Sequence, residues 1–179
     1  MIESFKVIEQ VMEKVSSLDD KLKKLDRLDQ PMDVTDVGDG EKSYRTLDES
    51  LENASDAERK IYEDANVETN EVNGRECLTR TDIDPDAVDG RGRSNLDRML
   101  DGKPPIVDGE PVELHHIDQK NDSPLAELKQ SEHRSPENSK VLHDKVGESE
   151  INRDGFKKER EDHWKARAEM ILQEREGTV

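Results

Sequence analysis

Two X-Gly dipeptides, each between β-prone arms, constrain this chain more than any other feature. Asn73-Gly74 lies within "VETNEVNGRECLTRT", and Asp108-Gly109 lies within "PPIVDGEPVELHH". Such pairs favour the two-residue turn of a β-hairpin, because Asn, Asp and Gly tolerate the positive φ that this turn requires. The sequence therefore predicts two hairpins. The outgoing strand of the second, residues 111–114, leads directly into two adjacent histidines, His115 and His116.

Helical signals surround the two hairpins. Ser55 with Glu58 has the spacing of a capping box and predicts a short helix, and a second short helix is expected from Ser94 to Leu100. "DSPLAEL" reads as a short extended or helical piece, and "SEHRSPENSKVLHDK" as a polar loop that enters a helix near Val141. Residues 153–176 predict a long final helix with an apolar stripe of Trp164, Ala168, Ile171 and Leu172. The fold class expected is α+β.

The N-terminal part has a different character. Residues 3–29 place apolar side chains at steps of three and four, which predicts an amphipathic helix or a short coiled coil that ends before Pro31. A segment rich in Gly, Pro and Asp follows, as in a linker. Only 30% of the chain is hydrophobic, against about 45–50% in a typical domain, so one core is not expected to cover all of it. We divide the chain into residues 1–54, a helix and acidic linker, and residues 55–179, a folded domain.

Charge limits the partners of this protein. The formal net charge is −17, of which −13 falls in residues 1–90 and −4 in residues 91–179. This balance argues against general attraction to nucleic acid or anionic membranes, so any phosphate-binding surface must be local. No apolar run approaches the length of a membrane span, and the first residues do not form a signal peptide. Cys77 is the only cysteine, which excludes an intramolecular disulfide and a cysteine-rich zinc site.

Four of the five histidines, His115, His116, His133 and His143, lie within a short stretch of the second half. A strand that ends in two imidazoles, followed by a loop and a helix with another, suits phosphodiester cleavage with a single metal ion. The ion neutralises charge at the phosphate, and a neutral imidazole removes a proton from water. Neighbours on a strand point to opposite faces, so a local twist or bulge is expected to divide these two roles between His115 and His116.

Several motifs in order carry a resemblance to a known family. They are Leu114-His115-His116, "SPLAEL", "EHR", "LHD" and "FKKEREDHWKARA". This pattern resembles the LHH nucleases, a branch of the HNH/endonuclease VII superfamily found as toxin modules of bacterial polymorphic toxins, and the resemblance covers roughly residues 57–172. It implies a ββα-metal (HNH/treble-clef-like) nuclease core, here with an extra hairpin and a long C-terminal helix, preceded by the N-terminal amphipathic helix and linker.

The resemblance also implies roles for the histidines. His115 corresponds to a metal ligand and His116 to the base that activates water. His133 falls near the position that orients this base, and His143 falls where a helix supplies a further metal ligand, although the family pattern also groups the last three histidines as water-activating residues. The implied cofactor is one divalent metal ion, Mg, Mn or Zn.

The implied activity is that of a metal-dependent endonuclease toxin used in interbacterial competition. Its substrate would be nucleic acid, DNA more than RNA, and a cognate immunity protein would neutralise it. We expect no membrane span, secretion by a route that does not depend on a signal peptide, and action in the cytoplasm of a target cell.

Other polar residues have ordinary structural interpretations. His163, beside Trp164, is expected to pack or cap, and Arg167 to lie on a solvated ion-pair face. The roles of Arg153 and Lys157 stay open. Three residues that flank the site could each be a helix cap or a hydrogen-bond partner: Asn95, Arg98 and Glu113. Four aspartates are expected in a solvated loop, since the glycine and distal glutamate of a calcium loop are missing: Asp82, Asp84, Asp86 and Asp89.

Two other classes of function compete with a nuclease. Composition alone favours an acidic inhibitor or immunity-type protein that mimics the charge of nucleic acid and does not hydrolyse it. A structural zinc module with histidine ligands is a further alternative, although small structural sites usually include cysteine. Both alternatives predict a folded protein without hydrolytic activity.

Overall fold

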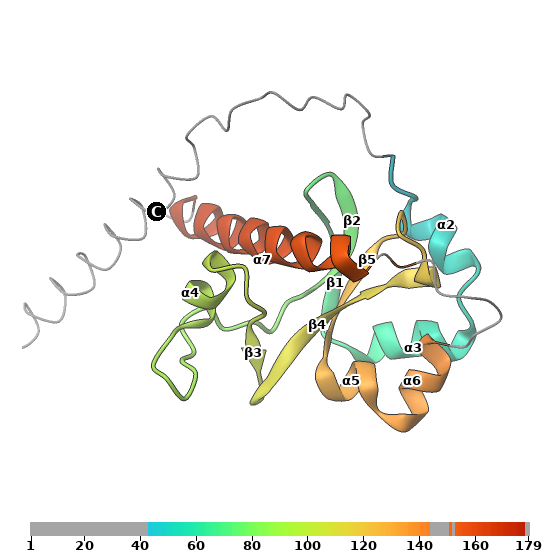
Figure 1. The fold of residues 1–179 in the computed structure, drawn as a ribbon, viewed down its shortest axis with the longest axis horizontal. Helices are drawn as coiled ribbons and strands as arrows, with labels where there is room; N and C mark the ends of the chain where they lie inside the picture. The colour runs from blue at the N-terminus through green and yellow to red at the C-terminus, as the bar shows by residue number, and fades with distance from the viewer. Residues whose placement is uncertain (1–42, 144–150, 152, 178–179) are drawn as a thin grey trace, which may run out of the picture. The chain divides into compact units, whose positions relative to one another are not determined.

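The structure is a computed structural model that describes residues 43–143, 151 and 153–177. The helix predicted for residues 3–29 and the linker after Pro31 lie outside the described residues. The elements, in chain order, are α2 (Leu47–Glu52), α3 (Asp56–Asp64), β1 (Val67–Val72), β2 (Arg75–Arg80), α4 (Asn95–Leu100), β3 (Ile106–Val107), β4 (Glu110–His116), the 3₁₀ turn η1 (Ile117–Gln119), β5 (Leu125–Lys129), α5 (Gln130–Arg134), α6 (Pro136–Leu142) and α7 (Arg153–Glu176). The expected α+β class with a long C-terminal helix is confirmed (Figure 1).

Both predicted hairpins are present. Asn73 and Gly74 have φ of 54° and 71°, and Asp108 and Gly109 have φ of 53° and 81°, as a two-residue turn requires. The five strands form one sheet in the order β1-β2-β5-β4-β3. All pairs are antiparallel except β2 with β5, where Cys77 lies opposite Leu125. This parallel pair, which joins the first hairpin to the rest of the sheet, was not predicted.

Strand β5 divides its side chains between the two faces of the sheet. Ala126 and Leu128 belong to a buried apolar cluster that also contains residues of α2, α3 and α6. Glu127, between them, points to the other face and contacts α7. This alternation is the ordinary period of a strand. Figure 1 shows the result, with α7 along one face of the sheet and α3, α5 and α6 gathered away from it.

Helix α7 is attached to the sheet by a buried ionic network. The carboxylate of Glu127, with no exposed side-chain surface, accepts hydrogen bonds from His163 Nε2 at 2.8 Å, from Arg167 Nε at 2.9 Å and from the backbone N–H of Arg80 at 2.8 Å. Burial raises the pKa of Glu127, but these partners outweigh it and leave that pKa below its usual value. The packing role of His163 is confirmed. The solvated face expected for Arg167 is wrong, because α7 buries this side chain against an acidic residue of the sheet.

The loop between β2 and α4 is also held by charged groups. Asp89 pairs with Arg93 and Arg98 at 2.9 Å each, and only 6% of its side chain is exposed. Asn95 bonds the carbonyls of Asp84 and Ile106 and the N–H of Ile106. The solvated loop predicted here is therefore wrong for Asp89, whose arginine partners replace water.

Helix α2 belongs to this folded unit. Its Leu47 is buried in the apolar cluster with Tyr62 and Leu142, although residues 47–52 fall in the segment we placed before the folded domain. The division at residue 54 stays a prediction.

In the described parts of the chain, no helix is both long and apolar enough to cross a membrane.

Gly102 provides a test of how α4 meets α7. Its φ is +71°, and a Cβ there would lie 3.1–3.2 Å from Glu161. We expect Gly102→Ala to lower the free energy of unfolding by about 2–3 kcal/mol, of which about 1–2 kcal/mol is the cost of left-handed backbone. Gly74 also has φ of +71°, but a Cβ there would have nothing within 4 Å. Gly74→Ala should therefore lower the free energy of unfolding only by the cost of the left-handed backbone. Urea denaturation measures both, and equal losses would contradict the packing of Gly102 on α7.

Candidate metal centre and active site

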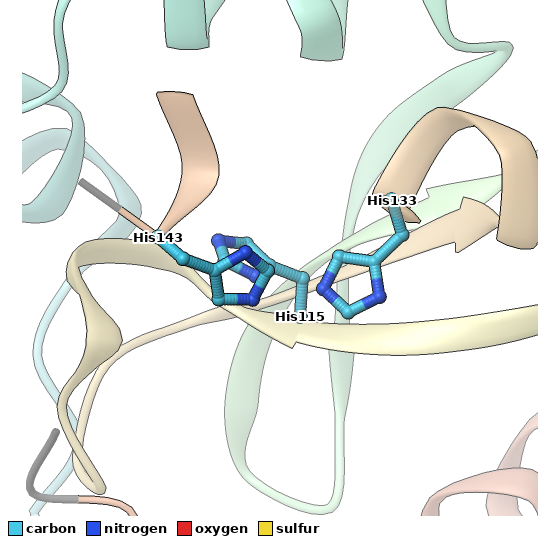
Figure 2. A group of neighbouring side chains, drawn as sticks. All are labelled: His115, His133 and His143. Atoms are coloured by element: carbon cyan, nitrogen blue, oxygen red, sulfur yellow. The ribbon is translucent and has the colours of Figure 1, made fainter. Parts of the chain in front are cut away.

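Three histidines from three elements meet beside the sheet. His115 ends the second hairpin on β4, His133 lies on α5, and His143 is the C-cap residue of α6. One ring nitrogen from each lies within 4.8 Å of the other two, and the ring centroids are 5.1–5.4 Å apart. Figure 2 shows the three imidazoles between β4 and the two helices. Strands β4 and β5 with α5 and α6 thus form the ββα unit expected of the core.

Two of these imidazoles have one nitrogen engaged and one left over. His133 Nδ1 is 2.7 Å from Glu113 Oε2, and His143 Nδ1 is 3.1 Å from the carbonyl oxygen of Ser139. The Nε2 atoms of His115 and His133 are buried and have no hydrogen-bond partner among the described residues. Metal-binding histidines typically donate their other N–H to a carboxylate or a carbonyl, as His133 and His143 do here.

Burial favours the neutral form of the His115 and His133 rings. Burial lowers the pKa of His115 well below its usual value, and the neighbouring His133 and His143 lower it further. Burial also lowers the pKa of His133, although Glu113 acts against it. Burial raises the pKa of Glu113, but hydrogen bonds from Arg134 and His133 outweigh it and leave that pKa below its usual value. A neutral imidazole is the form that binds a metal ion.

The donor set fits a divalent transition metal. Three nitrogens at about 2.0–2.1 Å from a tetrahedral zinc would be about 3.4 Å apart, so rotations that move the rings by about an ångström would complete the site. Three protein ligands leave a coordination position for water or substrate, as in catalytic sites. Imidazole favours zinc, copper, iron and nickel, whereas magnesium prefers oxygen ligands. Burial raises the pKa of the Cys77 thiol to about 12, so this residue is not a suitable ligand.

His116 lies on the opposite face of β4 from His115. Its ring centroid is 4.4 Å from that of Phe156 on α7, and its Nε2 is 3.5 Å from Glu159 Oε2. Only 5% of His116 is exposed, and its Nε2 has no hydrogen-bond partner among the described residues. The division of faces expected from the strand period is confirmed.

One cavity nevertheless reaches both neighbours. Its volume is 710 Å³, and it is lined by six consecutive residues, 111–116, together with His133, His143 and the start of α7. Strand β3 pairs with Glu110 and Pro111 but with no later residue of β4. In the part of the chain that the structure describes, the edge of β4 near the histidines therefore has no neighbouring strand. A substrate along this edge could contact side chains from both faces.

The lining of this cavity is locally cationic in an acidic protein. It includes four basic side chains and two acidic ones, Lys103, Arg134, Lys157, Arg160, Glu113 and Glu161. Arg160 lies over the Phe156 ring, with its guanidinium carbon 5.0 Å from the ring centroid. Among the described residues, neither Lys157 nor Arg160 forms an ion pair. These two cations are available to a phosphate. They form a local basic surface of the kind that a chain with a net charge of −17 needs in order to bind a phosphate.

The comparisons agree with this geometry. Residues 94–170 match the model of the LHH family, described as a nuclease of the HNH/ENDO VII superfamily with conserved LHH. This segment matches the LHH nuclease family. The match indicates hydrolysis of nucleic acid, and the resemblance of this segment to the LHH nucleases is confirmed. The match begins at Ser94, whereas the resemblance was placed from about residue 57. No curated protein and no solved structure matches the chain.

The structure places each predicted site residue of the LHH segment. His115 and His143, the residues predicted to bind the metal ion, come together, and their role as ligands stays a prediction; His116 lies apart, next to Glu159. His133 joins these two residues and, among the described residues, forms no hydrogen bond, ion pair or ring contact with His116, so its predicted role in orienting the base stays a prediction. Glu113, left open as a cap or hydrogen-bond partner, is the partner of His133. Arg98 bonds Asp89 and the Pro104 carbonyl rather than a site residue.

Sequence reasoning missed Glu159, whose carboxylate lies beside His116, and Arg75, which pairs with Glu159. Glu159 lies three residues after Phe156, and this spacing puts both on one face of the helix, but the spacing alone could not show which face meets His116. Arg75 lies 40 residues before the histidine pair on a different hairpin, and nothing in the local pattern connects it with the site.

Removal of the Glu113 carboxylate should weaken metal binding. We expect Glu113→Gln to lower zinc affinity about 10–100-fold, because the amide no longer fixes the tautomer and basicity of His133. Isothermal titration calorimetry measures this. Glu68→Gln, an exposed carboxylate on β1, is the control and should bind zinc as the wild type does. Unchanged affinity in Glu113→Gln would remove this residue from the metal centre.

Acid should destabilise the metal-free protein. The unfolded chain takes up a proton on each histidine near pH 6.5, whereas the lowered pKa of folded His115 delays this uptake. The free energy of unfolding is thus highest above pH 6.5. Below this pH it decreases, by up to about 1.4 kcal/mol per pH unit for each such imidazole. Urea unfolding in chelator at pH 7.5 and 5.5 tests this. His115→Leu should reduce the dependence on pH, and an unchanged dependence would show that His115 is not buried neutral.

Proposed function

We propose that this protein is a metal-dependent endonuclease toxin that hydrolyses phosphodiester bonds of nucleic acid, DNA in preference to RNA. The observation that carries this proposal is the group of three imidazoles, His115, His133 and His143, whose ring nitrogens converge within 4.8 Å inside an LHH segment. A binding protein without hydrolytic activity has no need for three converging imidazoles beside a cationic cavity. We propose His133 as a third ligand of the ion.

The chemistry of the site follows from the side chains around the cavity. A divalent ion held by the three imidazoles would stabilise negative charge at the scissile phosphate. His116 accepts a proton from a water molecule, the resulting hydroxide oxygen bonds to phosphorus, and the phosphorus bond to the leaving oxygen breaks. The leaving oxygen takes a proton from solvent, and the imidazolium of His116 returns its proton to solvent. Lys157 and Arg160 hold the neighbouring phosphate groups.

The biological setting rests on the resemblance to polymorphic toxin modules. In that setting the protein leaves its producer by a route independent of a signal peptide and acts in the cytoplasm of a competing bacterium. A cognate immunity protein in the producer would cover the cavity or an acidic surface near it. The preference for DNA follows from the same resemblance, and the site chemistry acts on either nucleic acid.

Cleavage assays test the proposal. Purified protein should nick supercoiled plasmid with zinc, manganese or magnesium and should be inactive in excess chelator. His116→Ala should lower the rate about 10²–10⁴-fold, the usual contribution of a general base, and should keep the fold by circular dichroism. His163→Gln is the matched control, because it changes a buried histidine outside the cavity and should retain cleavage.

The result also separates the competing functions. Wild-type cleavage by His116→Ala would end the assignment of the base. Failure of the wild-type protein to cut either plasmid or RNA with any of these ions, while it remains folded, would favour the acidic inhibitor. Loss of fold on chelation without hydrolysis would favour the structural zinc module.

A further inference from the structure

Arg75 is a buried arginine at the start of β2, outside the residues that match the LHH family. Only 3% of it is exposed. Its guanidinium donates hydrogen bonds to the carbonyl oxygens of Asn121, at 3.1 Å, and Ser123, at 2.6 Å from Nε. It also pairs with the carboxylate of Glu159 at 2.5 Å and lies 4.7 Å from the centroid of the Tyr44 ring. One side chain therefore joins the first hairpin, the loop before β5 and helix α7.

The loop that Arg75 holds follows directly from the histidine pair. Asp118 and Gln119 have φ of 63° and 53°, a left-handed conformation that is costly for residues other than glycine. Two consecutive residues of this kind persist only where their surroundings hold them. Arg45 pairs with Asp118 at 2.5 Å, and Arg75 binds the carbonyls at residues 121 and 123. Both arginines come from the segment upstream of the family match, and Gln119 lines the cavity.

The second group that Arg75 holds faces His116. Glu159 directs Oε1 to Arg75 and Oε2 to His116 Nε2, at 3.5 Å. This separation is longer than the roughly 2.7–3.2 Å of a hydrogen bond, and catalytic hydrogen bonds are often long until substrate is bound. The Phe156 ring, on the same helix, covers the imidazole at 4.4 Å. The approach of a carboxylate to Nε2 favours a proton on that nitrogen and leaves Nδ1 to accept a proton from water.

We propose that Arg75 is a positioning residue for catalysis. It orients the Glu159 carboxylate, which in turn sets the tautomer and the ring orientation of His116, and it fixes the strained loop that follows the histidine pair. The proposal rests on the proposed role of His116 as the base. It extends the functional unit upstream of Ser94 to the first hairpin, so that the LHH segment is incomplete without β2.

The guanidinium is needed for its shape as well as for its charge. A planar fork can bind a carboxylate with one edge and two carbonyl oxygens with the others, whereas a lysine ammonium is a point charge on a flexible chain. Arg75→Lys thus keeps the buried positive charge beside Glu159 but loses the simultaneous contact with Ser123 and Asn121. Glu159→Gln keeps the size of the side chain but removes the charge that both Arg75 and His116 face.

The experiment compares these two variants with Arg167→Lys in the full chain. Arg167 is a buried arginine of α7 that pairs with Glu127, away from His116, so its variant reports the general cost of losing a buried guanidinium. We expect Arg75→Lys and Glu159→Gln each to lower kcat on plasmid at least tenfold, with KM and zinc affinity within twofold of wild type. Their double variant should be no slower than the slower single one, because both act through His116. Arg167→Lys should lose stability and keep kcat.

A readout without catalysis separates this proposal from the function itself. Nitrogen-15 NMR of histidine side chains should show the proton of His116 on Nε2 in the wild type and a changed tautomer balance in Arg75→Lys and Glu159→Gln. If the wild type does not cleave but these NMR changes occur, the positioning role stands and the nuclease mechanism fails. An unchanged His116 spectrum in both folded variants, or a loss of kcat in Arg167→Lys equal to that in Arg75→Lys, would overturn the proposal.

Discussion

The alternation of side chains along β4 determines what this site can do. Because successive residues point to opposite faces of a strand, His115 is placed with α5 and α6, and His116 is placed with α7. Each face then surrounds its histidine with different chemistry. One has two further imidazoles and a carboxylate, and the other has an aromatic ring and a second carboxylate. Both histidines line the cavity along the strand edge, so in the proposed function two adjacent residues hold different roles without competing for one ligand.

Buried charge is the second constraint, since it ties α7 to the rest of the molecule. Arg75 and Glu127 are buried on neighbouring strands of the sheet, and each takes a partner from α7, Glu159 and Arg167 respectively. Such pairs add little net stability, because burial of the ions costs about as much as their attraction returns, but loss of one partner is expensive. They therefore specify the register of α7 on the sheet. Of the two pairs, only the one between Arg75 and Glu159 also faces His116, so packing and the position of the imidazole depend on the same contact there.

The predictable part of the fold is the part fixed by local chemistry. Asn73-Gly74 and Asp108-Gly109 located both hairpins because positive φ is a property of those residues, and Ser94 located α4 because its hydroxyl caps the helix. The family motif identified the four histidines of the site. Local chemistry could not show the parallel pairing of β2 with β5, the burial of Arg167 or the connection from Arg75 to Glu159. Each depends on which surfaces meet after the chain has folded, and residues 75 and 159 are too far apart in sequence for any periodic signal.

The acidic composition no longer conflicts with a nucleic-acid substrate once distance is considered. At physiological salt, charges farther apart than about 8 Å are largely screened, so a phosphate in the cavity responds mainly to the groups that line it. Those groups include four cations and two carboxylates, and one carboxylate, Glu113, is already paired with Arg134 and hydrogen-bonded to His133. The charges of the described residues that do not line the cavity act at longer range, where they slow encounter with polyanions at low salt. The affinity for a phosphodiester and the rate of encounter with a polyanion thus depend on different charged residues. A strongly acidic protein can therefore still bind a phosphodiester at one cationic cavity.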